Sequence, residues 1–513
     1  MDTKTLDYSF NLLDQPWIPI SGQGEKSIRD IFNDRGKTLL RLGGTPVEKI
    51  VIIRLLLCIV HASNSIKTMD DWKALTVDTI ADRALEYLEK WQDRFNLYDS
   101  QYPFGQFPQL KGKCDKSALA SISLAVAMGN KTVLSQWHQS DSFTDSQRAK
   151  LLLSGITYGC GGKKYDKNAK IDPHGPKKSS GSQGTLMGFN GYLHSFMIGK
   201  SIIETLHLNL LSENDLTSLN IFNAQDVMGR PFWESMPTDE AGPTATRYRV
   251  TYQGILFPLN KFFYYDAQAD YLLMTDGIVY PGHKNGQWDP SITLYLDKKD
   301  TKAVWTDTEK KPWRVLPSIF QFLNVDSQST TPVFLIRGLD KLRNDLYSSL
   351  GLWVGGIGVN TNSGEQYVTA RKDYVESEFT IPLDWALSGA PSYVRYKTMM
   401  ETINYYSNIV FSSVEKYYKT KNNQQSKDSK KQNKHSEAVA SEATRLFWEK
   451  MEPLAQEIID LSVKDAVAVE EADKKWKQIV VSSYEHFCPH ITPRQIQAYV
   501  ENTPNFKRKD KKK

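Results

Sequence analysis

Apolar residues recur at spacings of three and four from about residue 392 onward, and this pattern most limits how the chain can fold. Such spacing places apolar side chains on one face of an α-helix. Two long runs show it, and two further helical stretches follow, the last opened by Thr492 and Pro493. Because each apolar face must be buried against another helix, residues 391–513 are predicted to form a four-helix bundle.

Two polar segments belong to this helical region. Residues 419–435 are rich in Lys, Gln, Asn and Ser, and they are predicted to be a disordered linker between the first two helices. The chain ends in a basic tail at 507–513.

The chain before the bundle shows a different sequence pattern, with both helical and β-rich segments. Thr45, Pro46 and Glu48 form a capping box that opens a helix through about Ser63, and this helix is apolar nearly all round. From about 248 to 385, short β-rich runs alternate with Gly and Pro, among them 255–257, 292–296 and 333–336. A small-residue helix is also expected over 117–128. The predicted fold class is therefore α+β, with a mixed α/β domain over residues 1–390.

Composition excludes several classes of protein. The chain has 513 residues, 40% of them hydrophobic and 24% charged, with a formal net charge of +5, as in ordinary globular proteins. Its four cysteines lie far apart, which argues against a disulfide scaffold or a cysteine zinc site. The N-terminus lacks the apolar segment of a signal peptide, and Arg54 interrupts the longest apolar run. A cytoplasmic protein without a membrane segment is expected.

Catalytic patterns are not found. The nine histidines are scattered without an H-E-x-x-H pair, and no G-x-S-x-G sequence occurs. We therefore expect no catalytic residue, metal site or cofactor.

The segment from Tyr158 to Lys164 is the first candidate binding site. It consists of Gly159, Cys160, Gly161, Gly162, Lys163 and Lys164 after Tyr158. Glycines allow another molecule to approach the backbone closely, and lysines offer charge to phosphate. The spacing does not match a P-loop, which would need glycine at 157 and a hydroxyl at 164. Contact with a polyanion remains possible, and so does an ordinary surface turn.

A second Gly/Asn-rich loop covers residues 355–366. It is either a long hairpin turn or a tight turn that presents a polar side chain, such as Gln366, to a duplex.

The order of short motifs resembles one family over essentially the whole chain. The Asn11–Ile20 segment, the capping box at Thr45, the Tyr102–Gln106 segment and the Gly129–Leu134 segment precede the glycine loop. Together with the 355–366 turn and the C-terminal helices, they resemble the CasA family, the large subunit of the type I-E CRISPR surveillance complex Cascade.

The resemblance implies a non-enzymatic reader of DNA. In that family the N-terminal domain recognises the short duplex motif flanking the target, the PAM, from the minor groove, and starts duplex opening and R-loop formation. Carried over, the glycine loop falls on Gly159 to Gly162 with Lys163 and Lys164 beside it. The minor-groove lysine falls on Lys284, and the wedge glutamine falls on Gln366, with Glu365 where the family often has an amide.

The resemblance also implies partners. These are the backbone, small and 5′-handle-binding subunits of the complex, the CRISPR guide RNA, double-stranded target DNA and the helicase-nuclease that docks on the large subunit. The loop formed by Gly129, Asn130, Lys131, Thr132, Val133 and Leu134 would meet the guide RNA and a neighbouring subunit.

Two other functions stay open at this point. The chain could be an enzyme that acts on a phosphate-bearing substrate at the Gly-Lys loop. It could also be an assembly scaffold whose basic segments only increase solubility.

Overall fold

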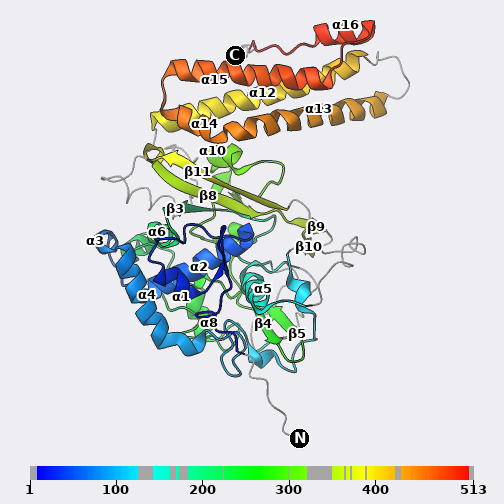
Figure 1. Ribbon diagram of the computed structural model, residues 1–513. Helices are drawn as coiled ribbons and strands as arrows, with labels where there is room; N and C mark the ends of the chain where they lie inside the picture. The colour runs from blue at the N-terminus through cyan, green and yellow to red at the C-terminus, as the bar shows by residue number, and fades with distance from the viewer. Residues whose placement is uncertain are drawn as a thin grey trace. The chain divides into compact units, whose positions relative to one another are not determined.

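The computed structural model describes residues 9–124, 142–161, 169–172, 183–222, 225–297, 300–320, 349–362, 365–369, 373–386, 390–421 and 429–507. The chain divides into two compact units, Met1–Glu378 and Phe379–Lys513. Helices and strands mix in the first unit, and the second is largely helical (Figure 1). The predicted α+β class is therefore confirmed. The units divide after Glu378, whereas the change in sequence pattern placed the domain boundary at residue 390.

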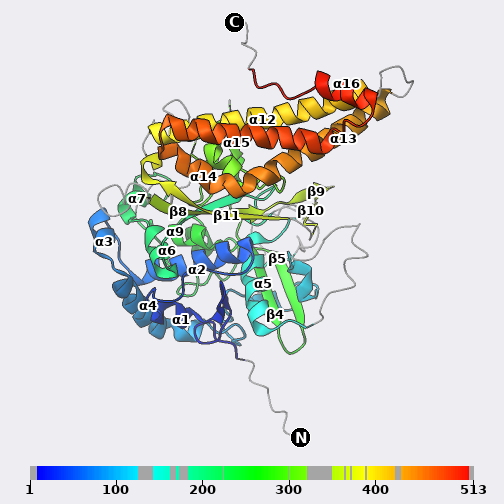
Figure 2. The same cartoon turned by 45° about the horizontal axis from the view of Figure 1, so that its top comes forward.

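The first unit is built around helix α2, Pro46–Ser63. Thr45 caps it, and the side chain of Glu48 bonds back to the Thr45 backbone, as the capping box predicted. From Ile50 to His61 every residue of α2 is buried. Helices pack around it, as Figure 2 shows: α4 (Val77–Trp91), α5 (Asp145–Tyr158), α6 (Ile202–Leu208) and α9 (Tyr252–Leu256). Shorter helices complete this unit: α1 (Ile28–Asn33), α3 (Met69–Ala74), α7 (Glu213–Thr217), α8 (Pro243–Tyr248) and α10 (Leu316–Ile319).

The sheets formed by the described residues are small. A three-stranded sheet has the order β11-β8-β3, formed by Tyr374–Pro382, Ser349–Ile357 and Leu193–Ile198, and β11 runs past Glu378, where the first unit ends. Strands β3 and β8 pair antiparallel, with His194 opposite Gly355. Four antiparallel pairs accompany it: β1–β2 (Ile18–Ile20, Gly24–Lys26), β4–β5 (Lys261–Asp266, Tyr271–Asp276), β6–β7 (Leu294–Asp297, Asp300–Ala303) and β9–β10 (Asn360–Asn362, Glu365–Tyr367).

Three local predictions for this unit were wrong. The run 255–257 was expected as a strand, but it begins inside the short helix α9 because Thr251 caps a helical turn there. The helix expected over 117–128 is only a 3-10 turn, Leu119–Ile122, as far as that stretch is described. The first part of the predicted 355–366 loop belongs to strand β8. The predicted run 333–336 lies outside the described residues.

The second unit contains the predicted helices as α12 (Pro391–Lys421), α13 (Ser429–Met451), α15 (Ala466–Phe487) and α16 (Pro493–Glu501). Helices α12, α13 and α15 pack against one another, and α16 packs on α12. The periodicity that ran through residue 461 is interrupted after Met451, where Pro453 allows only a 3-10 turn before the short helix α14, Ala455–Asp460.

The predicted linker over 419–435 was too long at both ends. Helix α12 continues to Lys421, where Lys419 pairs with Glu415 one turn earlier, and α13 already begins at Ser429. Lys and Gln favour helices nearly as well as Leu does, so a polar composition did not exclude helix here. Within the described part of the chain, no helix is long and apolar enough to span a bilayer.

Candidate functional site

The glycine loop begins where α5 ends. Thr144 and Gln147 form a capping box at the start of this helix, and Gly159 follows its last residue. Gly159, Cys160 and Gly161 are all buried, and Cys160 belongs to the hydrophobic core. The Cys160 side chain therefore packs in the core, while the backbone groups of the loop are available for hydrogen bonds.

A turn over residues 184–191 packs against the glycine loop. The Gly184 N–H donates to the Gly159 carbonyl at 2.6 Å, and the Leu186 N–H donates to the Thr157 carbonyl at 3.2 Å. A Cβ atom at residue 184 would lie 2.6 Å from both Thr157 O and Gly159 N, so only glycine permits this approach. We call this segment turn 184–191.

Gln366, on strand β10, joins the glycine loop to turn 184–191. Its Oε1 accepts from the Gly161 N–H at 2.8 Å, and its own N–H donates to the Gly161 carbonyl at 3.0 Å. Its Nε2 donates to the carbonyls of Gly188 at 2.9 Å and Phe189 at 2.7 Å. Gln366 is only 6% exposed. A side chain bonded in this way cannot insert into a duplex unless these bonds break, so the geometry makes Gln366 a tether.

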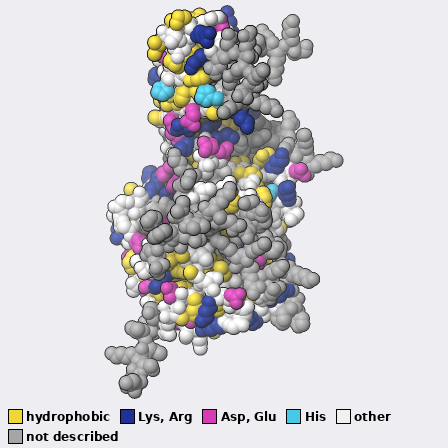
Figure 3. All heavy atoms as spheres, turned by 90° about the vertical axis from the view of Figure 1, so that its right-hand side faces the viewer, with side chains coloured by type: hydrophobic (Ala, Val, Ile, Leu, Met, Phe, Trp, Pro, Cys, Tyr) yellow, Lys and Arg dark blue, Asp and Glu magenta, His cyan; other side chains and the backbone are white. Residues whose placement is uncertain are grey.

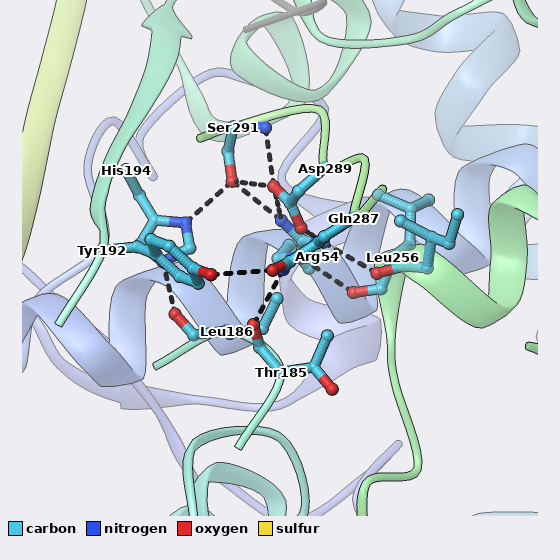
Figure 4. Close-up of polar contacts among 10 residues, drawn as sticks. Arg54, Thr185, Leu186, Tyr192, His194, Leu256, Gln287, Asp289 and Ser291 are labelled. Atoms are coloured by element: carbon cyan, nitrogen blue, oxygen red, sulfur yellow. Dashed lines mark hydrogen bonds and ion pairs between the residues drawn. The ribbon is translucent and has the colours of Figure 1, made fainter. Parts of the chain in front are cut away.

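A buried polar network supports turn 184–191 from the core side (Figure 4). Arg54 of α2 forms an ion pair with Asp289 at 2.7 Å, and both side chains are almost completely buried. Arg54 Nη1 also donates to Ser291 Oγ at 2.8 Å, and Ser291 Oγ lies 2.8 Å from Nδ1 of His194 on β3. His194 Nε2 lies 2.9 Å from the Leu186 carbonyl. The network therefore connects the central helix to turn 184–191.

The hydrogen bonds of His194 and its burial together indicate its protonation state. A carbonyl oxygen only accepts, so Nε2 carries a hydrogen. Nδ1 faces the Ser291 hydroxyl, which accepts from Arg54 Nη1 and donates to Asp289 Oδ1 at 2.8 Å, so the hydrogen bonds alone do not set the state of Nδ1. Burial lowers the pKa of His194 to about 4, although the Asp289 charge partly opposes this shift. Burial is the largest influence on the pKa of Asp289 and raises it, but the Arg54 charge and the hydrogen bonds from Arg54 and the Ser291 backbone together outweigh burial, and the pKa lies below its ordinary value. At neutral pH the network is thus an ion pair beside a neutral imidazole.

The turn that carries Lys284 lies next to turn 184–191. Lys284 is exposed on a 3-10 turn, His283–Asn285. Gln287 follows this turn, and it accepts from the Tyr192 hydroxyl at 2.7 Å and donates through Nε2 to the Thr185 carbonyl at 3.1 Å (Figure 4). Turn 184–191 therefore contacts the glycine loop, Gln366 and the segment after Lys284.

Several predicted site residues cannot be placed. Gly162, Lys163, Lys164 and the whole 129–134 loop lie outside the described residues. Glu365 is placed as part of strand β10, opposite Asn362, but only its backbone is described. On the face drawn in Figure 3, the described Lys and Arg side chains stand among Asp and Glu side chains instead of forming one continuous basic surface.

Comparison with known proteins identifies the family. The model of the family described as CRISPR-associated protein Cse1 matches residues 11–483. The chain belongs to this Cse1 family. A curated relative, CRISPR-associated protein CasA/Cse1 of Thermus thermophilus, is 25% identical over 333 residues. That alignment spans 60% of this chain and 59% of the relative's length. The resemblance drawn from the sequence is thereby confirmed.

Solved structures of Cse1 proteins share the fold. Thermobifida fusca Cse1 matches with a TM-score of 0.72 and 19% identity, covering 96% of this chain and 94% of that one. A chain from a structure described as a CRISPR RNA-guided surveillance complex matches with a TM-score of 0.68 and 15% identity, covering 96% of this chain and 98% of the other.

The sequence did not indicate that turn 184–191 is a part of this candidate site. A signal was present, since Gly184, Gly188 and Gly191 lie close together and the last two adopt φ of +64° and +87°. Such clustering of glycines marks tight turns and close backbone approaches, but it does not tell which distant segments the turn will contact.

Proposed function

We propose that this chain is the large subunit of a type I-E CRISPR surveillance complex and that it reads the PAM of double-stranded target DNA without catalysing a reaction. In this proposal it acts in the cytoplasm with the other subunits and the guide RNA. PAM binding through the minor groove starts duplex opening and R-loop formation, and the chain offers the docking surface for the helicase-nuclease. Family membership and the shared fold with a chain of an RNA-guided complex support this role.

One observation carries the DNA-reading part of the proposal. Two elements expected to contact DNA, the glycine loop and the β9–β10 hairpin, are far apart in sequence but are joined by hydrogen bonds in both directions between Gly161 and Gln366. A backbone-lined loop suits the minor groove, where the pattern of donors and acceptors is degenerate and groove shape carries information. Strand exchange with the guide is near energetic balance, so a small local distortion beside the PAM is sufficient to start it.

The decisive experiment is reconstitution of the complex with and without this chain. We expect tight binding only when the chain is present and the target carries its matched PAM, found by selection from duplexes with a randomised flanking motif. Equal affinity for matched and scrambled motifs, with or without the chain, would refute the proposal.

A pair of variants locates the reading element. Gly161→Asp places a negative charge in the buried glycine loop, whereas Gly161→Ala adds only a methyl group, and the melting temperature of each variant checks that it stays folded. Both keep the main-chain groups that bond Gln366. We expect Gly161→Asp to abolish discrimination between matched and scrambled motifs and Gly161→Ala to weaken it less. If both variants discriminate as the wild type does, the glycine loop does not face the DNA.

A further inference from the structure

Phe189 is exposed at the outer end of turn 184–191. Its exposed fraction is 47%, whereas Leu186 and Met187 of the same turn are completely buried. Burying a Phe side chain is worth about 1.5 to 3 kcal/mol, so the turn gives up stabilisation by leaving this ring in water. A single exposed apolar residue needs no explanation by itself, and the argument therefore rests on its surroundings.

The backbone that carries Phe189 is fixed. Every carbonyl from Gly184 to Gly191 accepts a hydrogen bond. The donors are the Met187 and Gly188 N–H groups, Gln287 Nε2, His194 Nε2, the Tyr192 N–H, Gln366 Nε2 and the N–H groups of Val359 and Thr306. A ring on such a turn binds a partner without the entropic cost of ordering its backbone.

Phe189 is also linked to the glycine loop through Gln366. The Gln366 amide donates to the Phe189 carbonyl at 2.7 Å and accepts from the Gly161 N–H at 2.8 Å. One buried side chain thus sets the position of the exposed ring relative to the loop that is proposed to meet DNA.

From this geometry we propose that Phe189 stacks on a nucleobase of the duplex beside the glycine loop, and that Gln366 is the positioning residue that holds it there. The inference rests on the proposed function and deepens it. The sequence assigned the wedge to Gln366, whose amide is fully engaged with backbone groups. Phe189 offers what a wedge needs, since apolar side chains inserted at a base step unstack it. An aromatic face also accepts any base.

The test uses the reconstituted complex with guide RNA and a duplex that carries the matched PAM. 2-Aminopurine replaces the first target base next to the PAM, and its fluorescence reports loss of stacking with its neighbours. We expect Phe189→Ala to weaken binding about 5- to 150-fold, as the loss of one aromatic–base stack would. When the wild-type complex binds, 2-aminopurine fluorescence should rise, and in Phe189→Ala this rise should disappear. Phe189→Trp should keep the wild-type affinity and the fluorescence rise, and Phe189→Leu should give values between those of the wild type and Phe189→Ala.

Control variants separate this inference from a loss of folding. Leu40 has the same exposed fraction, 47%, and lies in the same unit in a pocket lined by no residue of turn 184–191, so Leu40→Ala should bind as the wild type does. The melting temperature of Phe189→Ala should match that of the wild type, because the ring is half in water. Wild-type binding and fluorescence in Phe189→Ala would overturn the inference.

The outcome also distinguishes this inference from the proposed function. If Phe189→Ala behaves as the wild type while Gly161→Asp loses PAM discrimination, the stacking role falls and the PAM-reading role stands. If the wild-type complex itself binds matched and scrambled motifs equally, the proposed function fails and this inference fails with it.

Discussion

The C-terminal helices and turn 184–191 are held in place by different interactions. In the helices, apolar residues such as Ile403, Val410 and Phe447 are fully buried, and the backbone bonds lie within each helix. In turn 184–191, side chains from distant segments donate to backbone carbonyls. Apolar packing tolerates sliding and small changes of shape, whereas directed hydrogen bonds fix a loop in one conformation. A site that must present a backbone to a duplex needs the second kind of support.

The largest expected effect comes from the buried ion pair that supports the turn. Asp289→Asn leaves the Arg54 charge without its partner in the core, which should lower the free energy of unfolding by about 3 to 5 kcal/mol. The matched change in the second unit is Arg445→Ala on α13. Arg445 pairs with Glu442 and Glu449 but is 57% exposed, so its loss should cost under about 1 kcal/mol. Chemical denaturation measures both, and equal losses would contradict the contrast.

Acid should weaken the network through His194. Its folded pKa is about 4, below the ordinary value of about 6.5, so the unfolded chain takes up a proton at higher pH than the folded protein does. The stabilisation is complete above pH 6.5 and is lost as pH falls toward 4, by about 2 kcal/mol between pH 7 and pH 5. The free energy of unfolding, measured between pH 7 and pH 5, should fall with pH by this amount in the wild type and by less in His194→Gln. Parallel slopes would exclude this role of His194.

An effect of similar size is expected from the tether itself. Gln366→Leu leaves the Gly161 N–H and the carbonyls of Gly188 and Phe189 without their partner, which should cost about 1 to 3 kcal/mol. Hydrogen exchange at the Gly161 amide should become faster. Gln456 makes a similar pair of bonds to the Thr380 backbone in the second unit, but they are exposed. Gln456→Leu should therefore change stability by less than Gln366→Leu, and the reverse order would show that burial is not the cause.

Local signals explain how much of the fold was predictable. The capping box at Thr45 and the apolar spacing from 399 onward act over a few residues, so α2 and the bundle helices followed from them. The errors arose where local preference was weak. Residues 255–257 read equally well as a strand or a turn of helix, and the polar ends of α12 and α13 were mistaken for linker.

The sequence by itself determined the helical C-terminal unit, the central helix and two glycine-rich segments suited to close contact. Only the tertiary structure decided that Gly161 meets Gln366, which is 205 residues away, and that turn 184–191 bonds to both the glycine loop and Gln366. It also showed that Gln366 is buried and bonded to backbone groups, and that Phe189 is exposed on the turn that Gln366 contacts. The physical reason is that a hydrogen bond between distant segments has no period in the sequence, whereas apolar burial along a helix repeats every three to four residues.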